Sequence, residues 1–207
     1  MGTGVPIALG IADSLKRRDS TGVVTVMFGD GAIEEGAFYE SINFAILKKL
    51  PVFFVCENNL YSVYTPMKFR QPAKRKIHKM IKGLGCPAFV VDGNDPFKIY
   101  NKVSKSIKYV KSGKGPIFGE FLTYRHREHC GPNFDDNLNY RPKKEIKYWI
   151  KKDPLMFLEK KFFKKRDFIK LRLFKKKIIN EVNEAFLFAR KSKYPTYKIL
   201  KKHIYAK

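Results

Sequence analysis

Two short groups of residues in the first third of the chain have the types and spacing to hold a metal ion and a phosphate. Gly29-Asp30-Gly31 follows an apolar run at residues 23–28, and Asn58-Asn59 follows another at residues 52–56. If both runs are parallel strands of one sheet, they end at the same edge, where open α/β folds bind ligands. Neighbouring strands lie about 5 Å apart, so the Asp30 carboxylate and an asparagine amide oxygen would converge on one point.

The chemistry of this predicted cluster suits magnesium and a diphosphate. The backbone carbonyl of Tyr61, in the same loop as the asparagines, can add a third oxygen. Mg²⁺ prefers oxygen ligands and commonly takes substrate phosphates for its remaining positions. Gly29 and Gly31 allow a tight turn and a close approach of the backbone to a phosphate. A helix expected to begin near Ile33 would offer free N–H groups to the same anion.

The elements that must position these residues alternate along the chain. Apolar residues at helical spacing predict helices over residues 5–17, 34–48 and 99–110. Short apolar runs predict strands at residues 23–28, 52–56, 88–91 and 117–121. This alternation is typical of an α/β fold with a mostly parallel sheet and flanking helices.

The remaining third of the chain has a different character. Residues 123–142 are polar and rich in turn formers, which predicts a long loop. The chain from Lys143 to about residue 191 is basic and predicted to be helical, with a new helix starting at Asp153-Pro154. We therefore expect a partial α/β cofactor-binding domain over residues 1–142, and a helical C-terminal extension of the same domain over residues 143–207.

The charge balance leaves a second class of function open. The 207 residues include 43 Lys and Arg against 19 Asp and Glu, a formal net charge of +24. Residues 68–82 hold seven basic and no acidic residues, and residues 141–207 hold 23 basic and 6 acidic. A basic protein that binds nucleic acid or an anionic membrane without catalysis is therefore an alternative. The predominance of Lys over Arg favours compositional drift, since Arg is the better reader of phosphates and bases.

Two further observations concern the expected location of the protein in the cell. No run of eighteen apolar residues is present, so no membrane-spanning segment is predicted. The three cysteines, Cys56, Cys86 and Cys130, are odd in number and form no CxxC pair. A reducing, cytoplasmic location is therefore expected.

The residues around both motifs resemble a known family. The stretch GDGAIEEGAFYESINFAILKKLPVFFVCENNLYSVYT is similar to the alpha subunit of the thiamine-diphosphate-dependent decarboxylating component of 2-oxo acid dehydrogenase complexes, with pyruvate dehydrogenase the closest in character. The resemblance continues through GKGPIFGEFLTYRHREH, NYRPKKEI and KKDPLMFLEKKF. It implies a thiamine-diphosphate-binding fold, the cofactors thiamine diphosphate and Mg²⁺, and oxidative decarboxylation of pyruvate with acyl transfer to lipoyl.

The resemblance also assigns roles to residues of the predicted cluster. It implies that Asp30, the side-chain oxygen of Asn59 and the carbonyl of Tyr61 bind Mg²⁺. It places the backbone of Gly31 and Ala32, next to Gly29, against the diphosphate, and it implies that Asn58 supports the loop.

In the long loop, His129 matches the active-site histidine of the family, and Arg125 lies in the same cofactor-contacting segment. Zinc bound by His126, His129 and Cys130 is not expected, because no fourth ligand has suitable spacing.

The same resemblance implies partners. The glutamate that activates the cofactor comes from a beta subunit in this family, and the acyl group passes to a lipoyl-bearing acyltransferase, so a hetero-oligomer is expected. Family alpha subunits carry a long segment before the region matched by GTGVPIALGIA, whereas Met1 stands almost at that point, and we therefore expect a fold that is incomplete at its N-terminus. Related subunits acting on acetoin, a branched-chain 2-oxo acid or a sugar-derived substrate remain alternatives.

Overall fold

A computed structural model describes residues 2–164, 167–202 and 204 of the chain. The helices and strands, in chain order, are α1 (Gly4–Arg17), β1 (Val24–Gly29), α2 (Gly36–Leu47), β2 (Val52–Asn58), β3 (Tyr61–Ser62), β4 (Thr65–Pro66), α3 (Ile77–Gly83), β5 (Ala88–Asp92), α4 (Pro96–Lys111), β6 (Ile117–Leu122), α5 (Lys143–Lys151), α6 (Pro154–Phe162), α7 (Phe168–Lys191) and α8 (Tyr197–Lys202). Short 3₁₀ helices lie at Asp30–Glu34, Met67–Phe69 and Asp136–Leu138.

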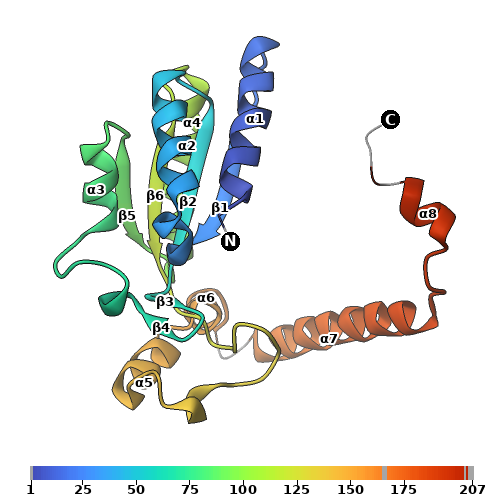
Figure 1. Cartoon of the computed structure of the whole chain (residues 1–207). Coiled ribbons are helices and arrows are strands. Elements are labelled where there is room, and N and C mark those ends of the chain that lie inside the picture. The colour runs from blue at the N-terminus through green and yellow to red at the C-terminus, as the bar shows by residue number, and fades with distance from the viewer. Residues whose placement is uncertain (1, 165–166, 203, 205–207) are drawn as a thin grey trace. The chain divides into compact units, whose positions relative to one another are not determined.

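Four parallel strands form the main sheet, in the spatial order β1-β2-β6-β5 (Figure 1). The prediction of an α/β fold with a parallel sheet is confirmed. The central strand β2 is buried on both faces from Val52 to Cys56, as its continuous run of apolar residues requires. The small antiparallel pair of β3 and β4 follows β2 and stands outside the main sheet.

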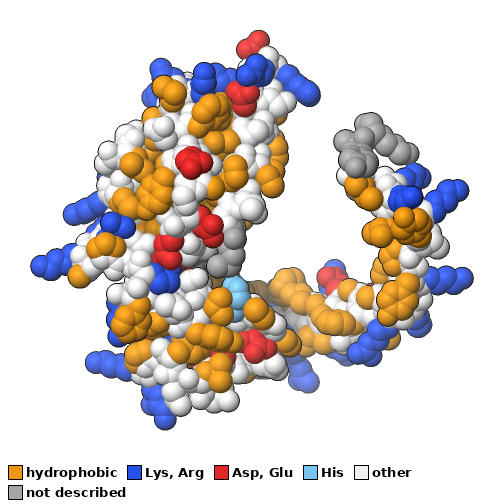
Figure 2. All heavy atoms as spheres, in the orientation of Figure 1, with side chains coloured by type: hydrophobic (Ala, Val, Ile, Leu, Met, Phe, Trp, Pro, Cys, Tyr) orange, Lys and Arg blue, Asp and Glu red, His pale blue; other side chains and the backbone are white. Residues whose placement is uncertain are grey.

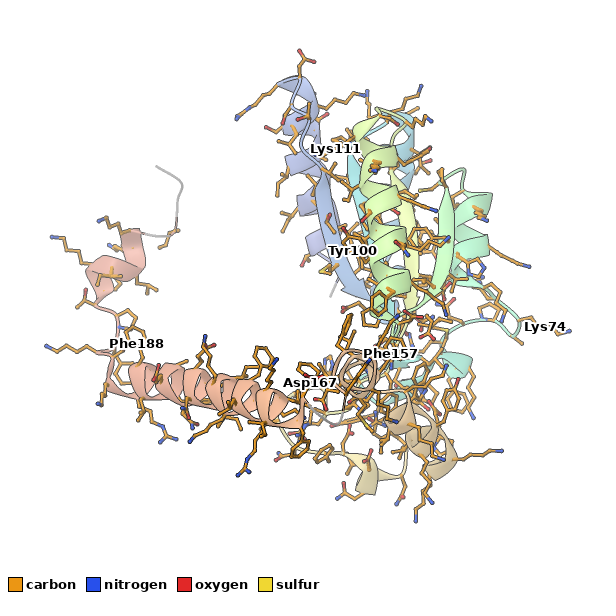
Figure 3. All side chains as sticks on the ribbon, turned by 180° about the vertical axis from the view of Figure 1, so that it is seen from behind. Lys74, Tyr100, Lys111, Phe157, Asp167 and Phe188 are labelled. Carbon is orange, nitrogen blue, oxygen red and sulfur yellow. The ribbon has the colours of Figure 1, made fainter. Side chains whose placement is uncertain are left out.

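Helices cover the two faces of the sheet unequally. One core cluster contains residues of α1, α2 and α3 packed on one face, with Phe38, Phe54 and Phe118 fully buried in it. The other face is covered by α4, which packs on Phe53 and Phe121 (Figure 3, where Tyr100 and Lys111 mark this helix). The chain therefore leaves β1 and β2 toward the face of α2 and α3, and it leaves β5 toward the face of α4.

The β1 side of the sheet is open. Within the described residues β1 pairs with β2 alone, and Met27 on this strand is 67% exposed. Ile7 and Ile11 on the outer side of α1 are also more than half exposed. In Figure 2 apolar side chains accordingly gather over α1 and α2 between lysines and arginines.

The predicted elements agree with the observed ones except between β2 and β5 and beyond residue 191, where α8 was not predicted. The helix predicted over residues 34–48 begins at Gly36, because the backbone of Glu35 is extended and separates α2 from the preceding 3₁₀ turn. Pro96 and the carboxylate of Asp95, which accepts hydrogen bonds from two backbone N–H groups, start α4. The β3–β4 pair and α3 were not predicted.

The C-terminal third contains the predicted basic helices. Asp153 accepts hydrogen bonds from the backbone N–H groups of Leu155 and Met156, so α6 begins at the predicted Asp153-Pro154. The chain divides into two compact units, residues 1–157 and 158–207. The predicted boundary at residue 142 falls inside the first unit, and the predicted division into domains stays a prediction.

None of the described helices has the length and apolar content needed to cross a membrane.

Candidate functional site

The two predicted motifs lie at the same edge of the sheet. The register of β1 and β2 pairs Gly29 with Glu57, so Asp30 and Asn59 both stand just beyond the carboxyl ends of adjacent parallel strands. The turn at Gly31 lies against β3, where a Cβ added to the glycine would come within 2.7 Å of the Ser62 hydroxyl oxygen. A side chain at position 31 would therefore push apart the two segments that carry the motifs.

Asp30 is engaged by an arginine that the sequence analysis did not single out. The Nη2 of Arg70 donates to Asp30 Oδ2 at 2.5 Å, and its Nη1 donates to Glu34 Oε1 at 2.5 Å. Both side chains of the first pair are well buried, with Asp30 1% and Arg70 9% exposed. Arg70 therefore bridges two carboxylates, and one of them is the carboxylate that is expected to bind a metal.

The asparagines hold the loop after β2 in shape. Asn58 donates to Glu120 Oε1 at 2.7 Å and accepts from the backbone N–H of Leu60. Asn59 Oδ1 accepts from the backbone N–H of Tyr61 at 2.9 Å. The Asn59 oxygen keeps a second lone pair, so its hydrogen bond to Tyr61 does not exhaust its capacity as a ligand.

The helix terminus expected near Ile33 is a 3₁₀ turn. Residues 30–34 form this turn, Ile33 is fully buried, and the carbonyl of Ala32 accepts from the N–H of Glu35. A Cβ added to Gly29 would meet no atom of the described residues within 4 Å, its chain neighbours apart. Gly29 and Gly31 thus differ, since only the second is closely packed.

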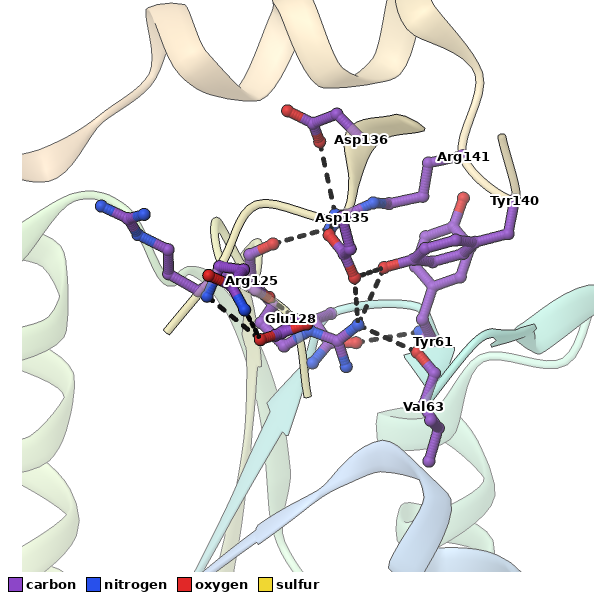
Figure 4. Close-up of polar contacts among 11 residues, drawn as sticks. Tyr61, Val63, Arg125, Glu128, Asp135, Asp136, Tyr140 and Arg141 are labelled. Carbon is purple, nitrogen blue, oxygen red and sulfur yellow. Dashed lines mark hydrogen bonds and ion pairs between the residues drawn. The ribbon is translucent and has the colours of Figure 1, made fainter. Parts of the chain in front are cut away.

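A network of charged and aromatic side chains fastens the long loop to β3 and the turn after it (Figure 4). Arg125 Nη2 donates to the carbonyl of Val63 at 3.0 Å and to the hydroxyl of Tyr140 at 2.8 Å. Asp135, which is buried, accepts from Arg125, Tyr140 and Arg141. The guanidinium predicted to contact cofactor is therefore engaged within the loop.

His129 lies in this loop and is exposed. Its neighbour Cys130 is exposed too. Among the described residues no group of three His, Cys, Asp or Glu side chains could hold a metal ion. A cation at the predicted site would accordingly depend on amide and carbonyl oxygens besides Asp30.

Burial and neighbouring carboxylates raise the pKa values of two ionisable groups next to the site. Burial raises the pKa of the Cys56 thiol well above its usual range, and the negative charges of Asp30 and Glu120 raise it further. Burial and a 2.8 Å hydrogen bond to Glu145 raise the pKa of Tyr61, whose ring packs edge-on against Tyr140. Both groups are therefore neutral at neutral pH.

The parallel sheet and the oxygen-rich cluster at its carboxyl edge define an α/β protein with a ligand-binding edge of the usual kind. Residues 1–198 match the family described as "Dehydrogenase E1 component", and the chain belongs to this family.

Several curated relatives are similar to the chain. The chain is 38% identical over 156 residues to "2-oxoisovalerate dehydrogenase subunit alpha" of Bacillus subtilis, a match that covers 74% of the chain and 46% of the relative. It is 36% identical over 200 residues to "Pyruvate dehydrogenase E1 component subunit alpha" of Zymomonas mobilis, covering 94% of the chain and 54% of the relative. A subunit of the same description from Staphylococcus aureus is 38% identical over 158 residues, covering 74% of the chain and 42% of the relative. The chain thus spans about half the length of the relatives it matches.

Proposed function

We propose that this chain is the alpha subunit of a thiamine-diphosphate- and Mg²⁺-dependent 2-oxo acid dehydrogenase, with pyruvate as its substrate. The observation that carries the proposal is the placement of Asp30 and Asn59 beyond adjacent parallel strands, next to the close contact of Gly31 with Ser62. Membership of the dehydrogenase E1 component family and similarity to two kinds of alpha subunit support it.

The residues present fit the proposed cofactors. Asp30, the side-chain oxygen of Asn59 and the carbonyl of Tyr61 supply one charged and two neutral oxygen ligands, a set that suits Mg²⁺ carrying a diphosphate. Asp30 is buried and already faces a cationic group, the guanidinium of Arg70. A metal ion would replace that positive charge, and Arg70 would keep Glu34 as a partner.

The protein residues hold and cover the cofactor in this proposal. Thiamine diphosphate, when bound, supplies the carbanion and the electron sink for decarboxylation. The backbone at Gly29, Gly31 and Ala32 would contact the diphosphate, and the loop fastened by Arg125 carries His129. As an exposed imidazole, His129 can move a proton or stabilise an oxyanion at the reacting carbon.

The site needs a second chain in this proposal. A beta subunit supplies the activating glutamate, and a lipoyl-bearing acyltransferase accepts the acyl group. The open edge at β1 and the exposed His129 are consistent with a site that other chains complete.

Calorimetry with Mg²⁺ and thiamine diphosphate tests the proposal, on the chain mixed with candidate beta subunits. We expect binding that requires Mg²⁺, strengthens with the beta subunit, and weakens roughly hundredfold in Asp30→Ala, as loss of the charged metal ligand implies. Asp19→Ala removes a carboxylate outside the site and serves as the control. Equal binding by wild type and Asp30→Ala would refute the metal role.

A branched-chain substrate is the second candidate, favoured by the 38% identity to a 2-oxoisovalerate dehydrogenase subunit. Decarboxylation rates of the assembled enzyme on pyruvate and on 2-oxoisovalerate separate the two. We expect the higher kcat/KM with pyruvate, and the reverse order would assign the branched-chain substrate.

A further inference from the structure

A cavity lies at the carboxyl edge of the sheet, beside the predicted metal site. It has a volume of about 670 Å³ and is lined at the ends of three strands, by Asn58 of β2, Leu122 and Thr123 at β6, and Asp92 of β5. Asp30, Asn59 and Tyr61 are not among its lining residues. The volume is within the range of about 300–1,000 Å³ that small-molecule sites occupy.

The topology places this cavity where open α/β sheets bind ligands. The chain leaves β2 toward the face covered by α3, and it leaves β5 toward the face covered by α4. β6 stands between these two strands. Strand connections that diverge to opposite faces open a crevice at the carboxyl ends, and ligands of this fold class occupy such crevices.

Glu120 on β6 is a buried carboxylate in the wall of the cavity. Its Oε1 accepts from Asn58 Nδ2 at 2.7 Å, and its Oε2 lies 2.7 Å from His78 Nδ1 and accepts from the His78 backbone N–H at 3.1 Å. With an ionised carboxylate as partner, Nδ1 of His78 carries a proton. Nε2 is then the ring nitrogen through which His78, itself a lining residue, exchanges a hydrogen bond or a proton with a molecule in the cavity.

Aromatic side chains of α5 also line the cavity. Trp149 of α5 lines the cavity, and its ring stacks on Tyr124 with centroids 5.8 Å apart and planes 9° apart. The neighbouring Tyr148 lines it as well, and Lys152 Nζ lies 4.9 Å from the Tyr148 ring centroid. The stacking holds the indole in one orientation, which lowers the entropy cost of stacking a ligand ring on it.

The charges around the cavity are mainly positive. Its acidic lining residues, Glu120 and Asp92, already face His78 and Lys152. Three further cations, Arg75, Lys76 and Lys79, line the cavity without an acidic partner among its lining residues. The field in the cavity therefore favours an anionic ligand.

We propose that this cavity is a second binding site, separate from the proposed cofactor site, for a small organic anion with a planar ring. The ring stacks on Trp149, the anionic group lies among the lysines and Arg75, and His78 hydrogen-bonds the ligand. None of the residues assigned to Mg²⁺ lines the cavity, so the site is distinct from the proposed metal site.

The fluorescence of Trp149 provides a direct test, since it is the single tryptophan of the chain. The full chain is titrated with two probes, AMP, which joins a purine ring to a phosphate, and 1-naphthoate, which joins an aromatic ring to a carboxylate. We expect saturable quenching by at least one probe. Adenosine and inorganic phosphate, which carry only one of the two features, should bind at least tenfold more weakly than AMP if AMP is that probe.

Three variants connect the binding to the cavity. His78→Gln and Lys152→Ala should each lower the affinity for the probe by about tenfold, equivalent to about 1.4 kcal/mol. Lys111→Ala, at the far end of α4, should leave this affinity unchanged. Calorimetry on Trp149→Leu, which removes the reporter together with the stacking surface, should show the largest loss. Circular dichroism of each variant shows whether it is folded.

Three outcomes would overturn the proposal. One is the absence of saturable quenching by both probes, and another is equal probe affinity in wild type and the folded His78→Gln and Lys152→Ala variants. The third is displacement of the probe by thiamine diphosphate with Mg²⁺, which would make the cavity part of the cofactor site. A failure of cofactor binding with intact probe binding would count only against the proposed function.

Discussion

The two ends of the sheet's carboxyl edge handle buried charge in different ways. Beyond β1 and β2, Asp30 and Glu34 are both held by Arg70, and Gly31 packs closely against Ser62. At the ends of β2, β6 and β5, Glu120 of β6 accepts hydrogen bonds from the Asn58 side chain and the His78 backbone and contacts the His78 ring, and a cavity lies next to it. The first end is a closed ion pair that a metal would have to displace, whereas the second is open without rearrangement. A parallel sheet can thus present a latent site and an accessible one on the same edge.

The largest expected difference between the two ends is in stability. Glu120→Gln should lower the free energy of unfolding by about 3 kcal/mol. Both Glu120 oxygens accept hydrogen bonds, and in the glutamine one of them is replaced by an NH₂ group that cannot accept. Asp30→Asn should lower the free energy of unfolding by about 1 kcal/mol. The remaining side-chain oxygen can still accept a hydrogen bond from Arg70, and Arg70 still pairs with Glu34. Urea unfolding monitored by circular dichroism measures both.

These two substitutions are matched, since each replaces a buried carboxylate by its amide. A greater loss in Asp30→Asn than in Glu120→Gln would contradict the description of the Asp30 end as the more replaceable one.

An intermediate effect is expected on metal binding at the closed end. Arg70→Ala leaves the buried Asp30 carboxylate without its cation, so the affinity of the chain for Mn²⁺ or Mg²⁺ should rise on the order of tenfold, equivalent to about 1.4 kcal/mol. Calorimetry with the metal alone measures this change. Lys68→Ala removes the same charge from an exposed position nearby and should have no such effect. Unchanged or weaker metal binding in Arg70→Ala would show that Arg70 does not compete for Asp30.

The smallest effect concerns Cys56, which lies in the central strand within the fields of both Asp30 and Glu120. Its pKa is raised in the folded state, so its contribution to stability is complete below the unfolded pKa of 9.0 and falls as the pH rises above that value. Between about pH 8 and about pH 9.5 the wild type should lose roughly 0.8 kcal/mol more than Cys56→Ala. Urea unfolding at the two pH values measures the difference.

Cys130→Ala, which removes an exposed thiol, is the control for this comparison. An identical pH dependence of wild type and Cys56→Ala would show that neither burial nor the two carboxylates acts on the thiol.

The sequence predicts the sheet and the placement of Asp30 and Asn59 at one edge of it because both depend on local signals. The runs at β1 and β2 are apolar and rich in β-branched or aromatic residues, and each motif directly follows its strand. Arg70 could not be assigned, because its contact with Asp30 spans 40 residues and depends on the β3–β4 pair, which is too short to leave a pattern. In the sequence Arg70 was one of seven cations in a segment that also suited nucleic acid.

The cavity was equally hidden from sequence reasoning. Glu120 and His78 are 42 residues apart, and Glu120 stands in a strand whose neighbours are apolar. A single acidic residue inside such a run is itself a signal, since an unmatched charge there would be costly. The sequence thus indicates that Glu120 needs a polar partner, but it does not indicate that this partner is His78 or Asn58.

The outer edge of β1, which pairs with no other strand among the described residues, has a practical consequence for handling the protein. Its free N–H and C=O groups, next to the exposed Met27, form a template on which a strand of another molecule can add. In a concentrated preparation of the isolated chain, light scattering will therefore report particle sizes that grow with concentration. The titrations described above should therefore be carried out at low micromolar protein concentration. Co-expression with a chain that pairs with this edge should give larger yields.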